Sequence, residues 1–256
     1  MEAMNIKFLG AHNTESQNTK LTSLLIDDSL VLDAGGLTSS LSFLAQQKLK
    51  VILLTHQHYD HIRDVPAIAM NFYLSGATIN IYSILPVYDA LTTHLMNGKL
   101  YPDFLERPSE NPTIKFTVIE PYQTEQIEGY TVMAVPVNHS VPAVGYQITS
   151  PDGRVVFYTG DTGSGLADCW ECVSPQLLII EVTSSNRFEK LPGHLTPNLL
   201  KQELDDFRKL RGYLPRVIVI HMSPGLEKEI DAEIAVIAED LNSKIALGYE
   251  GMQLDL

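Results

Sequence analysis

The residues best suited to chemistry lie together in the segment from Thr55 to His61, which reads Thr-His-Gln-His-Tyr-Asp-His. Four of its side chains, those of His56, His58, Asp60 and His61, are imidazoles or carboxylates within six consecutive positions. Imidazole and carboxylate ligands suit zinc, iron or manganese better than calcium. The spacing therefore predicts a site for transition-metal ions at this loop.

The elements around the loop explain how it could serve two metals. It follows an apolar run of buried-strand type at 51–55 and precedes a predicted helix over about 61–75. If the segment stays extended, His56 and His58 share one side, because side chains alternate along a strand. Asp60 then lies where the chain turns into the helix, so its side chain can point away from those of His56 and His58 and towards a second metal. A solvent-exposed polar loop is the alternative, which this concentration of ligands at a strand end disfavours.

The remaining chain alternates β-rich and helical stretches. Strands are predicted at 4–11, 21–28, 30–35, 78–83, 113–120, 130–137, 144–150, 154–160, 177–183 and 216–222. Helices are predicted at 38–48, 86–98, 196–211 and 227–241, with a Pro-containing loop at 99–112. Ser150-Pro-Asp-Gly153 reads as a hairpin turn, and Thr196-Pro197 as an N-cap followed by the first helical position. This order is typical of two packed sheets with helices outside.

Composition and net charge limit the kinds of partner that the chain is expected to bind. The chain has 256 residues and a formal net charge of −13, which suits one large domain. An acidic balance argues against nucleic acid, because proteins that bind it carry a basic patch. No apolar run is long enough to cross a membrane. Because residues 1–10 lack the basic and apolar regions of a signal peptide, we expect a cytoplasmic protein with no membrane partner.

The pattern His-x-His-x-Asp-His after a buried strand resembles the signature of the metallo-β-lactamase superfamily. Further residues at predicted strand ends fit this resemblance in order along the chain: Asp33, His139, Asp161 and His221. The resemblance implies an α/β fold, a four-layer αββα sandwich, as a single domain over 1–256. It also implies a helical and loop insertion at about 84–112, whose role as a lid or a dimer contact the sequence leaves open.

The same resemblance implies a ligand set for two divalent metals, with zinc as the first choice and manganese or iron as alternatives. One metal would take His56, His58, His139 and Asp161. The other would take Asp60, His61, His221 and the shared Asp161. Asp33 would orient the histidine loop rather than bind metal. The two metals should then lie about 3.5–4 Å apart.

A second pattern narrows the chemistry. Glu181-Val-Thr-Ser-Ser-Asn186, followed by Gly193-His-Leu-Thr-Pro197, resembles elements of two phosphodiesterase branches of that superfamily. These are the class II cyclic-nucleotide phosphodiesterases and RNase Z, the tRNA 3′-end processing endonuclease. By this resemblance His194 would protonate the leaving alkoxide or stabilise charge on the phosphorane. Glu181 would keep His194 charged and oriented. With the ligand Asp60, these two are the predicted catalytic residues.

We therefore expect a binuclear metal-dependent hydrolase, first of all a phosphodiesterase. Its substrate would be a small anionic phosphodiester such as a 3′,5′-cyclic nucleotide, cleaved by attack of a metal-bridging hydroxide. An RNase Z-like RNA-processing nuclease is an alternative, disfavoured by the charge and by the lack of a Gly/Pro/Lys-rich insertion. A thioesterase or lactonase of the same fold is another, which the Glu181 and His194 elements disfavour. A redox or non-enzymatic metal-binding protein is disfavoured by the absence of a glutamate from the histidine loop.

Several residues stay without an assigned function. His12, in a polar loop, and His94, in a predicted surface helix, receive no role. Cys169 and Cys172 form one C-x-x-C pair, which we interpret as two helix-borne thiols in a reducing compartment. The substrate-binding residues are unknown, with Tyr59, Arg63, Ser184 and Asn186 as candidates. The natural substrate, the native metal and the oligomeric state stay open, a homodimer being common in the superfamily.

Overall fold

Two seven-stranded sheets form the centre of the computed structural model, which describes residues 3–188 and 192–256. The first sheet contains, in spatial order, β14 (Gln253–Asp255), β1 (Asn5–Gly10), β2 (Ser23–Ile26), β3 (Leu30–Leu32), β4 (Val51–Leu53), β5 (Ile79–Ser83) and β6 (Ile114–Val118). The second contains β13 (Ile245–Leu247), β12 (Arg216–Ile220), β11 (Leu177–Glu181), β10 (Val155–Tyr158), β9 (Val144–Thr149), β8 (Tyr130–Pro136) and β7 (Thr124–Ile127).

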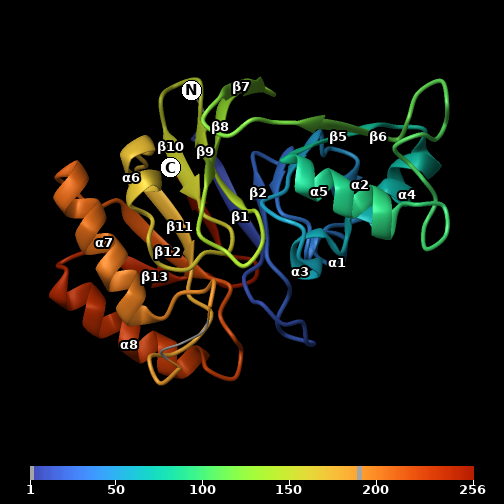
Figure 1. Ribbon diagram of the computed structural model, residues 1–256. Helices are drawn as coiled ribbons and strands as arrows, with labels where there is room; N and C mark the ends of the chain where they lie inside the picture. The colour runs from blue at the N-terminus through green and yellow to red at the C-terminus, as the bar shows by residue number, and fades with distance from the viewer. Residues whose placement is uncertain (1–2, 189–191) are drawn as a thin grey trace.

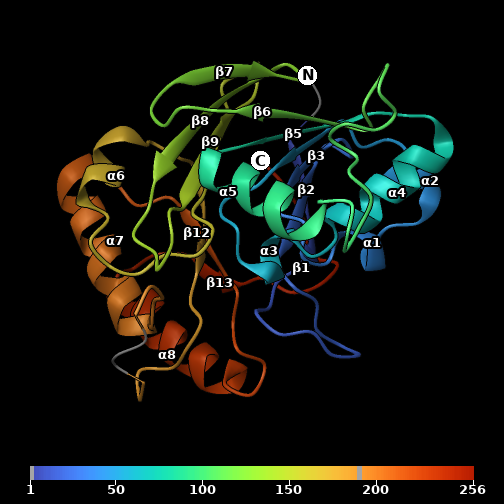
Figure 2. The ribbon, with the colours of Figure 1, turned by 45° about the vertical axis from the view of Figure 1, so that its right-hand side comes forward.

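Helices cover the outer faces of both sheets. One side carries α1 (Leu37–Ser40), α2 (Phe43–Gln46), α3 (Tyr59–Ile62), α4 (Val65–Ser75), α5 (Leu85–Ala90) and the π-helix η1 (Leu91–Leu95). The other carries α6 (Ala167–Cys172), α7 (Pro197–Arg211) and α8 (Glu227–Asp240). Figures 1 and 2 show the two helical groups on opposite sides of the paired sheets. The predicted four-layer αββα sandwich is thus confirmed.

Each sheet joins an antiparallel part to a parallel part. In the first sheet β3, β4, β5 and β6 are parallel, and in the second β10, β11, β12 and β13 are parallel. Strand β8 is antiparallel to β9, which is itself antiparallel to β10, so β8 runs in the same direction as β10. The carboxyl ends of β8, β10, β11 and β12 therefore lie at one edge of the second sheet.

Strand β11, near the middle of the second sheet, is buried on both faces. In β11 the side chains of Leu177 and Ile179 belong to the core between the sheets, whereas those of Leu178 and Ile180 pack with the α6–α8 layer. This division follows from the period-two alternation of a strand. It also explains why β11 is apolar throughout, apart from Glu181 at its end, rather than alternating with polar residues.

The predicted helix over 38–48 is broken into two. Leu41 is extended (φ −116°, ψ 137°) between α1 and α2, and the Ser42 side chain caps α2 by accepting a hydrogen bond from the Ala45 amide. The predicted helix at about 61–75 is likewise divided into α3 and α4. The Ser42 cap favours a new helix start at α2, because it satisfies a backbone amide there, whereas α4 begins at Val65 without a side-chain cap.

Two local predictions are confirmed. Gly153 adopts φ +86° in the hairpin turn, and its amide donates to the Ser150 carbonyl over 2.9 Å. Thr196 caps α7, and Pro197 is its first residue. The sequence did not predict β7, three of whose four residues are exposed, or the three-residue strands β13 and β14. Both cysteines lie on α6, as expected, with Cys169 buried and Cys172 exposed.

The segment 84–112 contains α5, η1 and a long loop. The expectation that it is an insertion, acting as a lid or a dimer contact, stays a prediction, as does the single domain over 1–256. Among the described residues there is no helix with both the length and the apolar character needed to cross a membrane.

The core between the sheets gives a test of the fold. Ile218 on β12 is fully buried there, whereas Val236 on α8 is 67% exposed. We expect Ile218→Ala to lower the free energy of unfolding by about 2–5 kcal/mol, because it removes buried methyl groups and leaves a cavity. The control Val236→Ala should change it by less than about 0.5 kcal/mol. Urea unfolding followed by circular dichroism measures both values, and equal losses would contradict this packing.

Candidate metal centre

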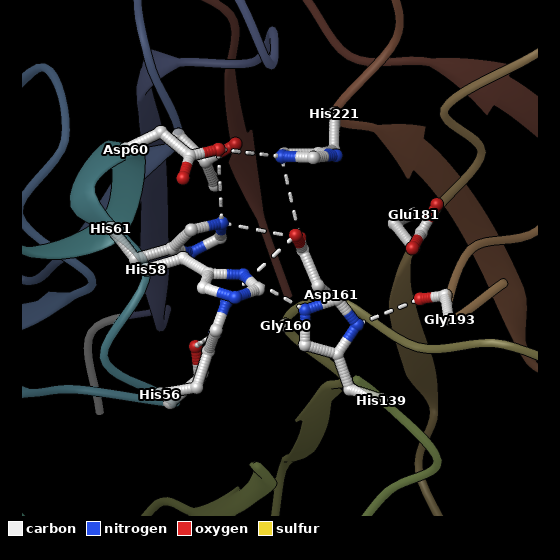
Figure 3. Close-up of polar contacts among 12 residues, drawn as sticks. His56, His58, Asp60, His61, His139, Gly160, Asp161, Glu181, Gly193 and His221 are labelled. Carbon is white, nitrogen blue, oxygen red and sulfur yellow. Dashed lines mark hydrogen bonds and ion pairs between the residues drawn. The ribbon is translucent and has the colours of Figure 1, made fainter. Parts of the chain in front are cut away.

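Loops at the carboxyl ends of strands from both sheets carry the candidate ligands. The histidine loop follows β4, His139 follows β8, Asp161 follows β10 and His221 follows β12 directly. Figure 3 shows these side chains directed into one space, with Asp161 near its middle. The structure thus brings together residues that lie far apart in the sequence.

The first candidate group joins both sheets. Its four ligand atoms lie within 4.8 Å of one another, and it contains His56, His58, His139 and Asp161. The Nε2 atom of His139 is 3.0 Å from Nδ1 of His58, and Nε2 of His56 is 3.8 Å from Oδ2 of Asp161. Three imidazoles and one carboxylate at this spacing are the donor set of a zinc-type site.

The second group shares Asp161 and contains Asp60, His61 and His221 in addition. The Nε2 atom of His221 is 3.2 Å from Oδ2 of Asp60 and 3.4 Å from Oδ1 of Asp161. The Nε2 atom of His61 is 3.2 Å from the same Asp161 oxygen. Because Asp161 belongs to both groups, its carboxylate could bridge two cations.

Unpaired polar atoms show that the space suits cations. His56 Nε2, His61 Nε2 and Asp161 Oδ1 are buried and have no hydrogen-bond partner within the described ranges. Burying such atoms without a partner costs free energy, so native proteins rarely do it without a compensating group. All three atoms belong to the two groups of candidate ligands. The residues therefore fit two divalent metal ions.

Charges in the cluster favour the ligand forms of two groups. Burial, together with the neighbouring His61 and other imidazoles, holds the pKa of His56 well below its usual range, so this ring is neutral. Burial alone would raise the pKa of Asp161, but the His221 and His61 imidazoles lower it well below its usual value. A neutral imidazole and an ionised carboxylate are the forms that bind metals.

Asp33 makes the contacts expected of an orienting residue. It is fully buried, and its Oδ1 accepts a hydrogen bond from the Thr55 amide over 2.8 Å. Its Oδ2 lies 2.8 Å from Nδ1 of His61 and accepts from the Tyr158 hydroxyl over 2.6 Å. A carboxylate on Nδ1 leaves Nε2 of the same ring as the ligand atom. Burial and the charge of Asp33 raise the pKa of Tyr158 well above its usual value, so the phenol stays a donor.

Two positions at the centre require unusual backbone conformations. Gly160 adopts φ +61°, and a Cβ placed on it would lie 2.8 Å from the Thr55 Cβ. Only glycine therefore fits beside the histidine loop at the turn that presents Asp161. His221 adopts φ +62°, a left-handed conformation that is rare for a residue with a side chain.

Glu181 and His194 form a pair beside the second group, and with His221 they make a third set of potential ligand atoms that lie within 4.8 Å of one another. Oε1 of Glu181 is 2.7 Å from Nδ1 of His194, and its Oε2 accepts from the Thr183 amide over 3.0 Å. The His194 ring stacks on that of His221, with centroids 5.6 Å apart and planes 11° from parallel. Burial lowers the pKa of His194, but the hydrogen bond and charge of Glu181 outweigh it, and the net pKa is raised.

The structure adds contacts that the sequence interpretation missed. The Thr183 hydroxyl lies 2.8 Å from Nδ1 of His221 and 3.2 Å from Nδ1 of His194, so it links the second group to the Glu181 pair. The Gly193 carbonyl lies 2.8 Å from Nδ1 of His139. Thr183 could have been found from the sequence, because it belongs to the Glu181-Val-Thr pattern. Gly193 stands in the Gly-His-Leu-Thr-Pro pattern, but the contact of its backbone carbonyl with His139 could not be read from the sequence.

The four candidates for substrate contact divide into two kinds. Arg63 pairs with Glu15 and Asp64, and the Asn186 side chain accepts a hydrogen bond from the Asn198 amide over 2.7 Å. Ser184 is 5% exposed. Tyr59, in the histidine loop, is 63% exposed and is available to a ligand.

Comparison with known proteins agrees with the layout of the fold. Residues 25–222 match the family described as the beta-lactamase superfamily domain. Yeast PDE1 in its unliganded crystal structure superposes with a TM-score of 0.85, at 18% identity and with 100% of both chains covered.

Curated relatives match at lower coverage. A 3′,5′-cyclic-nucleotide phosphodiesterase of Aliivibrio fischeri is 23% identical over 223 residues, 77% of this chain and 66% of that protein. A ribonuclease Z of Pyrococcus abyssi is 28% identical over 154 residues, 58% of this chain and 48% of that protein. The chain thus spans from about half to just under two thirds of the length of these relatives.

The contacts of Asp33 predict a role in metal binding without direct ligation. We expect Asp33→Asn to weaken metal binding by about 10–100-fold, because it removes the charge that fixes the His61 ring. Competition titration with a chelator measures this affinity. Tyr158→Phe, which removes one donor to Asp33 and leaves the carboxylate in place, should have a smaller effect. A wild-type affinity in Asp33→Asn would contradict the orienting role.

Proposed function

Because the chain belongs to the beta-lactamase superfamily domain family, we propose that it is a two-metal hydrolase of small phosphodiesters, with a 3′,5′-cyclic nucleotide as the first candidate substrate. The observation that carries the proposal is the Glu181–His194 pair, 2.7 Å apart and set against the second candidate metal group. The metal groups alone would suit many hydrolyses, whereas this pair supplies the acid that a poor alkoxide leaving group needs.

The candidate ligands would form two metal-binding sets. His56, His58 and His139 would hold one divalent cation, and Asp60, His61 and His221 the other, with Asp161 shared. Two divalent cations, when bound there, supply an activated water and polarise the phosphoryl oxygens. Zinc is the first choice, because the donors are imidazole nitrogens and carboxylate oxygens. We also propose zinc as the native metal, a cytoplasmic location and a homodimer. The proposed phosphodiester hydrolysis does not depend on these three points.

His194 would act on the leaving oxygen. Glu181 occupies Nδ1 of its ring, which leaves Nε2 as the nitrogen that faces a substrate. The proton on Nε2 would pass to the alkoxide as the phosphorus–oxygen bond breaks, and the ring would become neutral. Glu181 itself is held by the Thr162 and Thr183 amides, so its carboxylate cannot turn away from His194.

The names of two relatives support the choice of substrate. The Aliivibrio fischeri relative is named a 3′,5′-cyclic-nucleotide phosphodiesterase, and yeast PDE1 superposes over the whole chain. An RNase Z-like nuclease is the second candidate, since other relatives are named ribonuclease Z. The net charge of −13 disfavours it, because a long RNA must be attracted by a basic surface.

A substrate panel tests the proposal. Protein loaded with zinc, manganese or iron would be offered bis-p-nitrophenyl phosphate, cyclic AMP, cyclic GMP, a pre-tRNA, a thioester and a lactone. We expect turnover of the small phosphodiesters, and its loss together with metal in His58→Ala. Turnover of the thioester or lactone alone would refute the proposal, and cleavage of the pre-tRNA alone would favour the second candidate.

The acid role of His194 predicts a pH dependence. A raised pKa means that the protonated ring is present below that pKa and is lost as pH rises through it, so the rate should fall on the alkaline side. His194→Ala should slow phosphodiester cleavage by about 10²–10⁴-fold and retain metal. Glu181→Gln lowers the pKa of His194 and should move the alkaline limb to lower pH. An unchanged pH–rate profile in both variants would exclude this role.

A further inference from the structure

His12 is a buried histidine that lies outside both candidate metal groups. It is 2% exposed, and its Nδ1 is 2.6 Å from Oε1 of Glu250, which lies 238 positions further along the chain. Its Nε2 is 3.6 Å from a carboxylate oxygen of Glu227. Because the two carboxylates face different ring nitrogens, the cluster does not converge on one point as a metal site would.

Glu250 holds the segment around His12 through several donors. The Ala11 amide donates to Glu250 Oε1 over 3.3 Å, and the Lys20 amide donates to the same oxygen over 2.9 Å. Both ends of the exposed loop between Ala11 and Lys20 are thus attached to one carboxylate. Buried hydrogen bonds to a charged acceptor are stronger than those between neutral groups.

Ala11 connects this carboxylate to the candidate metal centre. Its carbonyl accepts a hydrogen bond from the His221 amide over 2.6 Å. His12 pairs with Met222 in an isolated β-bridge, and the Asn13 amide side chain donates to the Ser223 hydroxyl over 2.9 Å. The segment 11–13 therefore lies along the segment that carries His221 and contacts it at successive residues.

The backbone of His221 needs such support. Its φ of +62° is unfavourable for a residue with a Cβ, and such a conformation persists only where surrounding contacts offset its cost. In this conformation the ring lies with Nε2 between Asp60 and Asp161. Loss of the Ala11 contact would let the chain relax and the ring turn away from these carboxylates.

Glu250 is itself fixed from both sides. The Gly251 amide donates to the Phe8 carbonyl over 2.8 Å. The Gly248 amide donates to the Val219 carbonyl, also over 2.8 Å and two residues before His221. The backbone on either side of Glu250 is therefore anchored both to β1 and to β12, the strand that ends directly before His221.

We propose that Glu250 and His12 are positioning residues for His221, which hold its backbone in the left-handed conformation through the Ala11 segment and so complete the second metal group. The inference rests on the proposed function, in which His221 binds metal. It adds a structural support for His221 that comes from the N-terminal and C-terminal segments, which meet where β1 pairs with β14.

The charges of this pair reinforce the contact. Burial lowers the pKa of His12, but the hydrogen bond and charge of Glu250, with a contribution from Glu227, raise it overall. Burial raises the pKa of Glu250, and the contact with His12 lowers it overall. Both shifts favour the charged forms of the pair, which strengthens the contact between Nδ1 of His12 and Oε1 of Glu250.

The test measures zinc affinity by calorimetric titration against a competing chelator. Glu250→Ala and His12→Leu should weaken one of two zinc equivalents by about 10–100-fold, the scale for lost support of a ligand. The weakened zinc equivalent should be the one that His221→Ala loses, and the affinity for the other equivalent should not change. His12→Asn, whose side-chain amide can donate from nearly the Nδ1 position, should retain most of the affinity. Glu250→Gln gives a second, milder loss if Glu250→Ala folds poorly.

A matched control comes from the opposite end of the first sheet. Asp27 accepts hydrogen bonds from the Asn5 amide and the Tyr130 hydroxyl, so it also ties distant segments through a carboxylate. Asp27→Asn should leave both zinc affinities unchanged. Equal weakening of both equivalents in Glu250→Ala, or no weakening at all, would overturn the inference while the metal centre stands. Retention of both equivalents in His221→Ala would overturn the metal centre and the inference with it.

Discussion

The shared carboxylate of Asp161 is the constraint on which the centre depends. It is 2% exposed and lies among imidazoles from the histidine loop and from the end of β12. Burying an ionised group is unfavourable unless opposite charges and hydrogen bonds compensate it. Removing one of these imidazoles would leave the buried charge of Asp161 less fully compensated, so the ligands from distant segments depend on one another.

This requirement explains the extent of the supporting contacts. Asp33 fixes His61, Gly160 allows close approach to Thr55, and Thr183 connects His221 to Glu181. Asp33, Gly160 and Thr183 themselves lie outside the two groups that share Asp161. Their contacts restrict the orientation of the rings and the path of the backbone, which a site with closely spaced ligands needs, since small errors in position cost affinity.

The same sandwich can serve different hydrolyses, because a fold supports a site without fixing its chemistry. The two candidate metal groups are common to many reactions, whereas the Glu181–His194 pair would act only where a leaving group needs a proton. The proposed specificity therefore rests on a few residues between β11 and α7 and not on the architecture. The formal net charge of −13 is a second reason for proposing a small substrate rather than a long polyanion.

The sequence alone determined the types and the order of the candidate ligands. The histidine loop could be found from its local spacing, and the other candidates end apolar runs of strand type, where the family resemblance assigned them a role. Tertiary structure alone decided the contacts between distant segments. His12 and Glu250 are 238 positions apart, and the short strand β14 that brings them together has too few residues to show a periodic pattern. The left-handed backbone of His221 was equally hidden, because its amide donates to the carbonyl of Ala11, a residue far away in the sequence.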